Sequence, residues 1–140
     1  MLKVHERRLV LQIVVDHPTL SSSDLGAILD IQPDETWDRG DSYKPSSNAE
    51  MQKYKFSRWA ITETTQSLDE LSEVIPVLLA RMRGRIDNFL KLPDDSRVAL
   101  TLFVDESQSV IGTGFDASVV NFLARIRAEI DISLVVHTAT

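Results

Sequence analysis

Four stretches of the chain have the hydrophobic pattern of β-strands. Residues 9–15 are apolar at nearly every position and rich in β-branched side chains, which is typical of a central strand buried on both faces. Residues 54–63 and 98–104 alternate between two faces instead, and Trp59 is expected on the core side of the first. Residues 132–136 predict a last strand.

Helical spacing of apolar residues predicts three helices. The first lies in residues 21–32, where serines offer caps and Pro33 forces an end. The longest covers 68–89, opens with a capping box at 67–70 and is expected to kink at Pro76. The last is capped by Asp116, and its apolar stripe is Val119, Val120, Leu123, Ile126 and Ile130.

The order of these elements predicts an α+β fold. We expect a two-layer sandwich in which about three helices pack on one face of a mostly antiparallel sheet of four to five strands. Residues 9–16 and 98–105 resemble each other, which hints at internal symmetry. A length of 140 residues fits a single domain, residues 1–140.

The polar segment between residues 32 and 53 is long for a loop in a domain of this size. It contains prolines, Gly40 and two aromatic residues, and it predicts either a long loop or an irregular edge strand. Its beginning is acidic, because residues 30–41 hold five aspartates and glutamates against one arginine. Such segments often carry function.

Composition excludes several classes of function. The 15 lysines and arginines against 21 aspartates and glutamates give a net charge of −6, which argues against nucleic acid as a partner. The absence of cysteine removes disulfides and thiolate metal sites. The apolar run at 9–15 contains Gln12 and leads into Asp16, so it is neither a signal peptide nor a membrane span. We expect a cytoplasmic protein that does not bind membranes.

Several short motifs follow one another along the chain in a specific order. They are the helix end Ala27-Ile28-Leu29-Asp30-Ile31-Gln32-Pro33, the pair Gly40-Asp41, Trp59, Ser67-Leu68-Asp69-Glu70-Leu71, and Gly114-Phe115-Asp116. Together they resemble a family of small bacterial domains known as domain of unknown function 4279. In that family a glycine usually stands where this sequence has Asp30, and the loop before the tryptophan is shorter.

The resemblance to this family implies the fold described above and a bacterial, intracellular setting. It transfers no catalytic residue, because the activity of the family is not established. Some relatives look like neighbours of toxin systems, which implies that an immunity-type binding role is worth testing.

Candidate catalytic and cofactor motifs have simpler explanations. Gly112–Ala117 matches a dinucleotide fingerprint, but Asp116 would occupy the positive end of the helix with its own charge, which favours a capped loop. Asp16 and Asp105 end the two similar strands, and antiparallel neighbours place such ends apart, so we expect solvated carboxylates. The histidines lack metal-ligand spacing and are expected at the surface or at strand ends: His5, His17 and His137. We therefore expect no cofactor and no metal.

Charged and aromatic residues point instead to binding. The polar segment between residues 32 and 53 contains Trp37, Asp38, Arg39, Asp41 and Tyr43. Exposed aromatics among carboxylates are common at protein interfaces, although Trp37 could equally fold back to cover the sheet. The end of the longest helix has a local excess of +3, which predicts either a solvated face or a patch for an acidic partner: Arg81, Arg83, Arg85 and Lys91 against Asp87.

We therefore expect a non-enzymatic domain that binds a protein partner or a copy of itself. The binding surface would be residues 32–53 and the sheet face beside Arg58. The alternative is a domain that binds a small molecule or an anion, or a weak enzyme, with a pocket between Arg58, Trp59 and Arg81. The acidic segment and the basic helix end could each recognise a partner, or recognise each other across a dimer.

Overall fold

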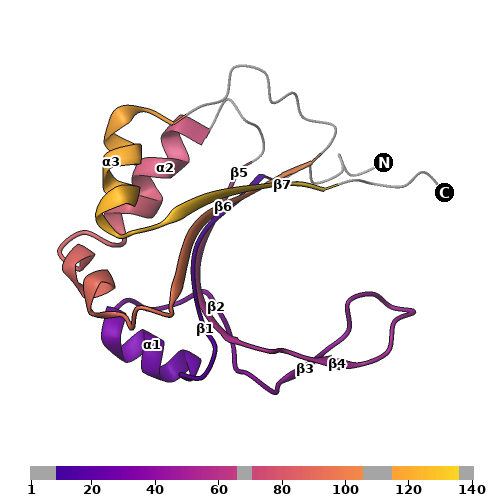
Figure 1. Cartoon of the computed structure of the whole chain (residues 1–140). Coiled ribbons are helices and arrows are strands. Elements are labelled where there is room, and N and C mark those ends of the chain that lie inside the picture. Colours follow the sequence, from indigo (N-terminus) through magenta and orange to yellow (C-terminus); the bar gives the residue numbers. More distant parts are fainter. Residues whose placement is uncertain (1–8, 66–70, 106–114, 136–140) are drawn as a thin grey trace.

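A five-stranded mixed sheet forms the centre of the protein (Figure 1). The computed structural model describes residues 9–65, 71–105 and 115–135. The strand order is β2-β5-β1-β6-β7, and all neighbours are antiparallel except β6 and β7. The strands are β1 (Leu9–His17), β2 (Glu35–Trp37), β5 (Ser57–Thr65), β6 (Arg97–Asp105) and β7 (Glu129–Val135). The predicted α+β class and the mostly antiparallel sheet are confirmed.

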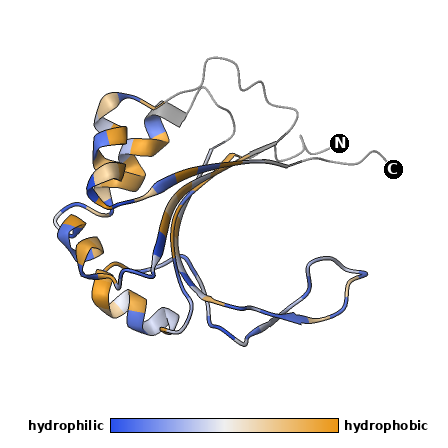
Figure 2. Ribbon diagram, viewed as in Figure 1, coloured by the Kyte–Doolittle hydropathy of each residue, from blue (hydrophilic) through white to orange (hydrophobic). Residues whose placement is uncertain are grey.

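Helices cover one side of the sheet. Within the described residues they are α1 (Ser22–Leu29), α2 (Leu71–Ala80), the 3-10 helix η2 (Ile86–Lys91) and α3 (Ala117–Arg125). Figure 1 shows the sheet strongly curved, with all four on its convex side. Hydrophobic residues concentrate in these helices and in the central strands (Figure 2). None of the helices in the described ranges is long and apolar enough to cross a membrane.

The core lies between the helices and one face of the central strand. On β1 the side chains of Leu9, Leu11, Ile13 and Val15 point into it and are at most 1 % exposed. Of the alternate positions of β1, which face the other way, Gln12, Val14 and Asp16 are buried and Val10 is half-buried, so the prediction of a strand buried on nearly both faces is confirmed. This strand pairs with β5 along its whole length and with β6 over most of it, which explains its continuous apolar sequence.

The prediction of one long helix over residues 68–89 is wrong. α2 ends at Ala80, and η2 begins only at Ile86. Gly84 separates them with a φ of 81°, a left-handed conformation that an α-helix cannot contain. Pro76, where a kink was expected, lies inside α2. The predicted capping box at 67–70 falls outside the described residues.

The predicted last helix begins correctly but ends too late. Asp116 caps α3, and its Oδ1 accepts a hydrogen bond from the Val119 amide at 3.0 Å. Arg127 then adopts a φ of 58°, which ends the helical path, so Ile130 belongs to β7. Val120 is exposed, and the buried stripe consists of Val119, Leu123 and Ile126.

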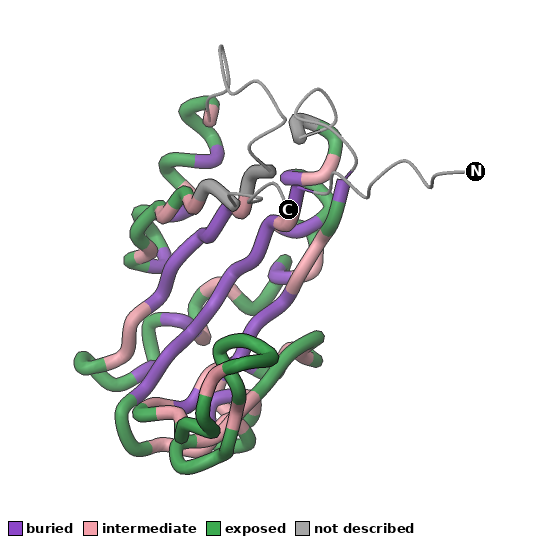
Figure 3. Tube along the Cα trace, turned by 90° about the vertical axis from the view of Figure 1, so that its right-hand side faces the viewer, coloured by how far each residue is buried: buried purple, intermediate pink, exposed green. Residues whose placement is uncertain are grey.

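The segment between residues 32 and 53 is partly an edge strand and partly a hairpin. Its first part forms β2, which pairs with β5. Residues 40–55, here called the arm, contain the two-residue strands β3 (Ser42–Tyr43) and β4 (Gln52–Lys53), which pair with each other. Figure 1 shows the arm projecting from one end of the sheet on its concave side, and in Figure 3 it lies in front of the strands and is mostly exposed.

Candidate functional site

The candidate site is the concave face of the sheet, the face turned away from the helices. No helix of the described ranges lies on it (Figure 1). The strand registers arrange its side chains in rows that run across the strands, and three of these rows form the candidate site. The first row is Trp37, Arg58, Asp16 and Arg97; the second is Glu35, Ala60, Val14, Ala99 and Glu129; the third is Thr62, Gln12, Thr101 and Asp131.

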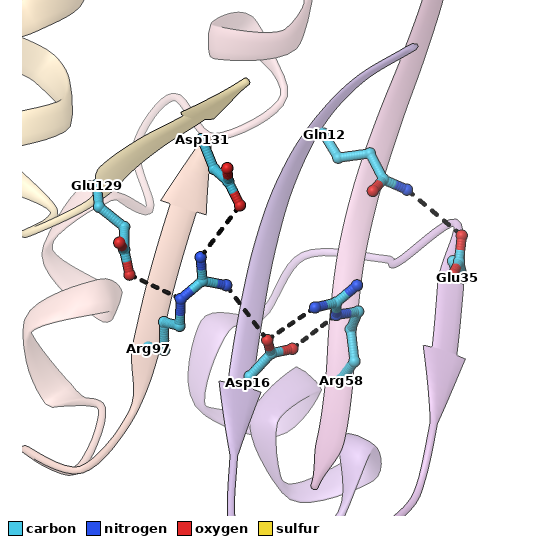
Figure 4. A network of polar contacts seen from close by, with 7 residues as sticks. All are labelled: Gln12, Asp16, Glu35, Arg58, Arg97, Glu129 and Asp131. Carbon is cyan, nitrogen blue, oxygen red and sulfur yellow. Dashed lines mark hydrogen bonds and ion pairs between the residues drawn. The ribbon is translucent and has the colours of Figure 1, made fainter. Parts of the chain in front are cut away.

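Asp16 is the centre of the first row and is held by two arginines (Figure 4). Arg58 donates from Nε to Asp16 Oδ1 at 2.7 Å and from Nη2 to Oδ2 at 2.8 Å. Arg97 Nη1 lies 3.6 Å from Asp16 Oδ2 on the other side. This fork-shaped geometry fixes both the carboxylate and the Arg58 guanidinium.

The expectation that Asp16 is a solvated strand-end carboxylate is wrong. Its side chain is only 11 % exposed, because the strands on both sides of β1 place an arginine directly opposite it. Asp105 lies at the other end of β6, as the antiparallel arrangement required. Arg97 was missed as a site residue. It precedes Ala99 by two positions and Thr101 by four, and alternate residues of a strand point to the same face of the sheet, so the sequence could have placed it there.

Arg97 also connects the sheet centre to its outer strand. Its Nε lies 2.7 Å from Glu129 Oε1, and its Nη2 lies 3.4 Å from Asp131 Oδ2. At the opposite edge, Gln12 Nε2 donates to Thr62 Oγ1 at 3.0 Å and to Glu35 Oε2 at 3.4 Å. Figure 4 shows these contacts as two separate groups, one that joins β7, β6, β1 and β5 and one that joins β1 to β2.

An aromatic stack adjoins the first row where the arm leaves the sheet. The stack consists of Tyr43, Tyr54 and Trp37, with ring centroids 4.1 Å apart at both contacts and nearly parallel planes. The Arg58 guanidinium lies 4.6 Å from the centroid of Trp37, and Phe56 packs at 5.9 Å from the same ring. Such cation–π contacts strengthen when the cation is partly desolvated.

Trp37 is therefore half-buried on the concave face, where it neither projects freely nor covers the helical core. Its indole Nε1–H is buried and finds no acceptor within the described part of the chain. A buried donor without an acceptor costs about 1–3 kcal/mol.

The other polar candidates near Trp37 shape the backbone. The Asp38 carboxylate accepts a hydrogen bond from the Ser22 amide at 2.6 Å and so ties the end of β2 to α1. Asp41 accepts from the Asp38 amide at 2.8 Å. The Arg39 amide donates to Ser57 Oγ at 3.0 Å. Together these contacts hold the chain between β2 and the arm against α1 and β5.

Trp59 lies on the opposite face of β5 from Arg58. It is fully buried among the helices, donates from Nε1 to the Ile31 carbonyl at 3.2 Å and meets Phe89 edge-on at 6.4 Å. Neighbouring residues of a strand point to opposite faces, so Arg58 and Trp59 do not line one pocket.

The acidic segment and the basic end of α2 meet within the chain. Arg81 Nη1 lies 2.6 Å from Asp34 Oδ2, and Arg85 Nε lies 3.4 Å from Asp30 Oδ2. The hydrogen bond from Arg81 lowers the pKa of Asp34, and one from the Thr62 amide adds to the effect, against the opposing effect of burial. The same pair raises the pKa of Arg81. Much of the charge that could have served a dimer contact is thus neutralised internally.

His17 is buried at the end of β1, which agrees with the expectation of a surface or strand-end position. Its Nδ1 accepts hydrogen bonds from the amides of Leu20 at 2.9 Å and Thr19 at 3.0 Å, which places the proton on Nε2. Nε2 lies 2.7 Å from Asp95 Oδ1. Both ring nitrogens therefore hold the structure together.

A hollow of about 420 Å³ lies beside α1, away from the concave face. Its lining includes Ser22, Ser23, Gly26, Asp30, Pro33 and Thr36. Among the described residues, no group of three or more histidine, aspartate or glutamate side chains is arranged to hold a metal ion.

The fold and this face define a class of protein: an α+β domain with helices on one side of a curved sheet and a polar, aromatic-flanked face on the other. The chain belongs to the family described as Domain of unknown function (DUF4279), whose model matches residues 5–137. The resemblance stated from the sequence motifs is confirmed by this match. Neither a curated protein nor a solved structure matches the chain.

Proposed function

We propose that this chain is a non-enzymatic binding domain that holds a segment of a partner protein on its concave face. The observation that carries the proposal is the Arg58–Trp37 contact, at 4.6 Å, on a sheet face that no described helix covers. Sheet faces in domains are normally packed against another layer. Tryptophan, tyrosine and arginine are also the residues that contribute most at protein interfaces.

The side chains of this surface are held in place before any partner arrives. Arg58 is fixed by two hydrogen bonds to Asp16, and Trp37 is stacked between Tyr54 and Arg58. Binding to such groups loses little side-chain entropy, which otherwise costs about 0.5–1.5 kcal/mol for each immobilised side chain.

Site-specific photo-crosslinking tests the proposal. A benzophenone amino acid would replace Tyr43 on the arm or Phe103, which lies on the concave face of β6, and in control proteins Val77 or Leu90, which are exposed on the helical side. We expect one crosslinked protein from the first pair and none from the controls. The crosslinked protein, once purified, should bind the wild-type chain. Its affinity for the Arg58→Ala variant should be at least tenfold lower, and circular dichroism should confirm that this variant is folded.

Crosslinks of equal yield from the helical positions, or none from the concave positions, would overturn the proposal.

The arm offers a second variant. Residues 44–51 can be replaced by a two-residue turn that keeps β3 and β4 paired and leaves β2 untouched. This variant should fold and bind more weakly, because Tyr43 and Tyr54 then lose the neighbouring part of the arm.

Small-molecule or anion binding is the second candidate function, and the hollow beside α1 favours it. Its volume of about 420 Å³ falls in the range of small-ligand sites, and two serines of α1 line it. A thermal-shift screen with phosphates, nucleotides and carboxylic acids distinguishes the two functions. A ligand at a hundred times its Kd stabilises by about 2.7 kcal/mol, and Ser22→Ala should remove the shift if the hollow is the site.

A further inference from the structure

On the concave face, the described residues of the five strands carry more negative than positive charge. It holds the carboxylates of Asp16, Glu35, Glu129 and Asp131. Among the described residues of the five strands, the guanidinium groups on this face are those of Arg58 and Arg97. Four carboxylates against two guanidinium groups leave a formal excess of two negative charges.

This excess lies at the two outer strands. In the centre, Asp16 is satisfied by Arg58. On β7, Arg97 is shared, and it lies closer to Glu129 (2.7 Å) than to Asp131 (3.4 Å), whose side chain is 47 % exposed. On β2, Glu35 is exposed and contacts the neutral amide of Gln12, with no ion pair to any described residue.

The second row connects these two places in a straight line. Glu35 pairs with Ala60, Ala60 with Val14, Val14 with Ala99, and Ala99 with Glu129. The three side chains between the two carboxylates are short, apolar and at most 1 % exposed, so a segment that links the carboxylates would pass above them. Four steps between neighbouring strands, each about 4.8 Å, separate the ends by about 19 Å.

We propose that the partner segment is cationic and extended, and that it crosses the strands above the second row, from the exposed carboxylate at one end to those at the other. It would place one arginine or lysine at Glu35 and another at the Glu129–Asp131 pair. An extended chain advances about 3.3 Å per residue, so the two basic residues would stand about six positions apart. This inference rests on the proposed function and adds the chemistry and spacing of the partner.

Synthetic peptides test the charge and the spacing. The probes are a glycine–serine peptide with two arginines six positions apart, the same peptide with the arginines two positions apart, and its glutamate counterpart. Binding is followed by NMR titration at low ionic strength. We expect the first peptide to bind at least fivefold more tightly than the second, and the glutamate peptide to cause no shifts on the concave face.

The variants separate local contacts from overall charge. Glu35→Gln combined with Asp131→Asn should lower the affinity of the chain for the first peptide at least tenfold. Glu73→Gln combined with Asp87→Asn removes the same charge from exposed positions on the helical side and should change its affinity less than twofold. Equal weakening by both pairs, or no preference for arginine, would overturn this inference. Concave-face crosslinks to a partner without basic residues would overturn it while leaving the proposed function standing.

Discussion

Arg58 and Asp16 face each other across β5 and β1 and share two nearly parallel hydrogen bonds, of 2.7 and 2.8 Å. The contact joins positions 42 residues apart in the sequence. It lies on the concave face, where water has little access to the carboxylate. The pair therefore contributes both to stability and to the placement of the guanidinium over Trp37.

Replacing Asp16 by alanine should lower the free energy of unfolding by about 3 kcal/mol, because two arginines then lose their shared carboxylate in a partly desolvated place. Urea denaturation followed by circular dichroism measures the loss. Glu50→Ala, an exposed change on the arm, serves as the matched control and should stay within about 0.5 kcal/mol of wild type. Equal effects of the two changes would contradict this account.

The ion pair between Asp34 and Arg81 predicts a pH-dependent contribution to stability. The pKa of Asp34 is lowered from its usual 3.8 in the folded state by the Arg81 hydrogen bond. Its contribution is therefore present above that usual value and is lost as the pH falls through the lower folded pKa. Asp34→Asn should be less stable at neutral pH by under about 1 kcal/mol, since the pair is partly exposed.

Denaturation curves of wild type and Asp34→Asn between pH 7 and pH 2 measure this difference. The difference in free energy of unfolding should stay constant at neutral pH and disappear in acid below the usual pKa of the carboxyl group. Added salt should also reduce this difference. A gap that widens in acid would show that Asp34 is not stabilised as a carboxylate.

Asp30 ends α1 in a left-handed conformation, with φ 56° and ψ 40°. Glycine adopts this conformation without the strain of a Cβ, so Asp30→Gly should raise the free energy of unfolding by about 0.5 kcal/mol. The exposed contact to Arg85 at 3.4 Å offsets only part of the gain. Asp30→Ala is the matched control and should be destabilising, because it loses the ion pair and keeps the strain.

Two glycines should respond in opposite directions to alanine. Gly26 lies inside α1, and a Cβ there would meet Trp59 Cδ1 at 3.8 Å, an ordinary contact, so Gly26→Ala should stabilise by about 1 kcal/mol. Gly84 has open space around it but a φ of 81°, so Gly84→Ala should destabilise by about 1 kcal/mol. Thermal unfolding measures the stability of both variants. A Gly84→Ala variant more stable than wild type would show that α2 can extend through residue 84.

Features that depend on a few neighbouring residues could be predicted from the sequence. The cap at Asp116 and the strand alternation around Trp59 are examples, because hydrogen bonds and side-chain direction there are set locally. The break at Gly84 could not be predicted from the apolar stripe. A 3-10 helix also brings residues three apart to one side, so Met82, Ile86 and Phe89 continue the spacing across the break.

The site itself depended on strand order, which apolar spacing does not encode. Arg58 was recognised as a candidate, but its partner Asp16 was assigned to solvent, since nothing local shows that β1 lies between β5 and β6. Trp59 was placed correctly in the core and incorrectly in the same pocket as Arg58. Whether the concave face binds a protein stays a prediction.

The central place of β1 also determines when the protein can fold during synthesis. This strand leaves the ribosome before its neighbours in the sheet, and one of them, β6, begins about 80 residues later. Because synthesis proceeds at about 5–20 residues per second, β1 has an unpaired edge for several seconds, and its apolar sequence favours aggregation during that time. Pairing across such separations is also slow. The finished sheet therefore forms late, and chaperone binding to residues 9–17 on the nascent chain is the expected consequence.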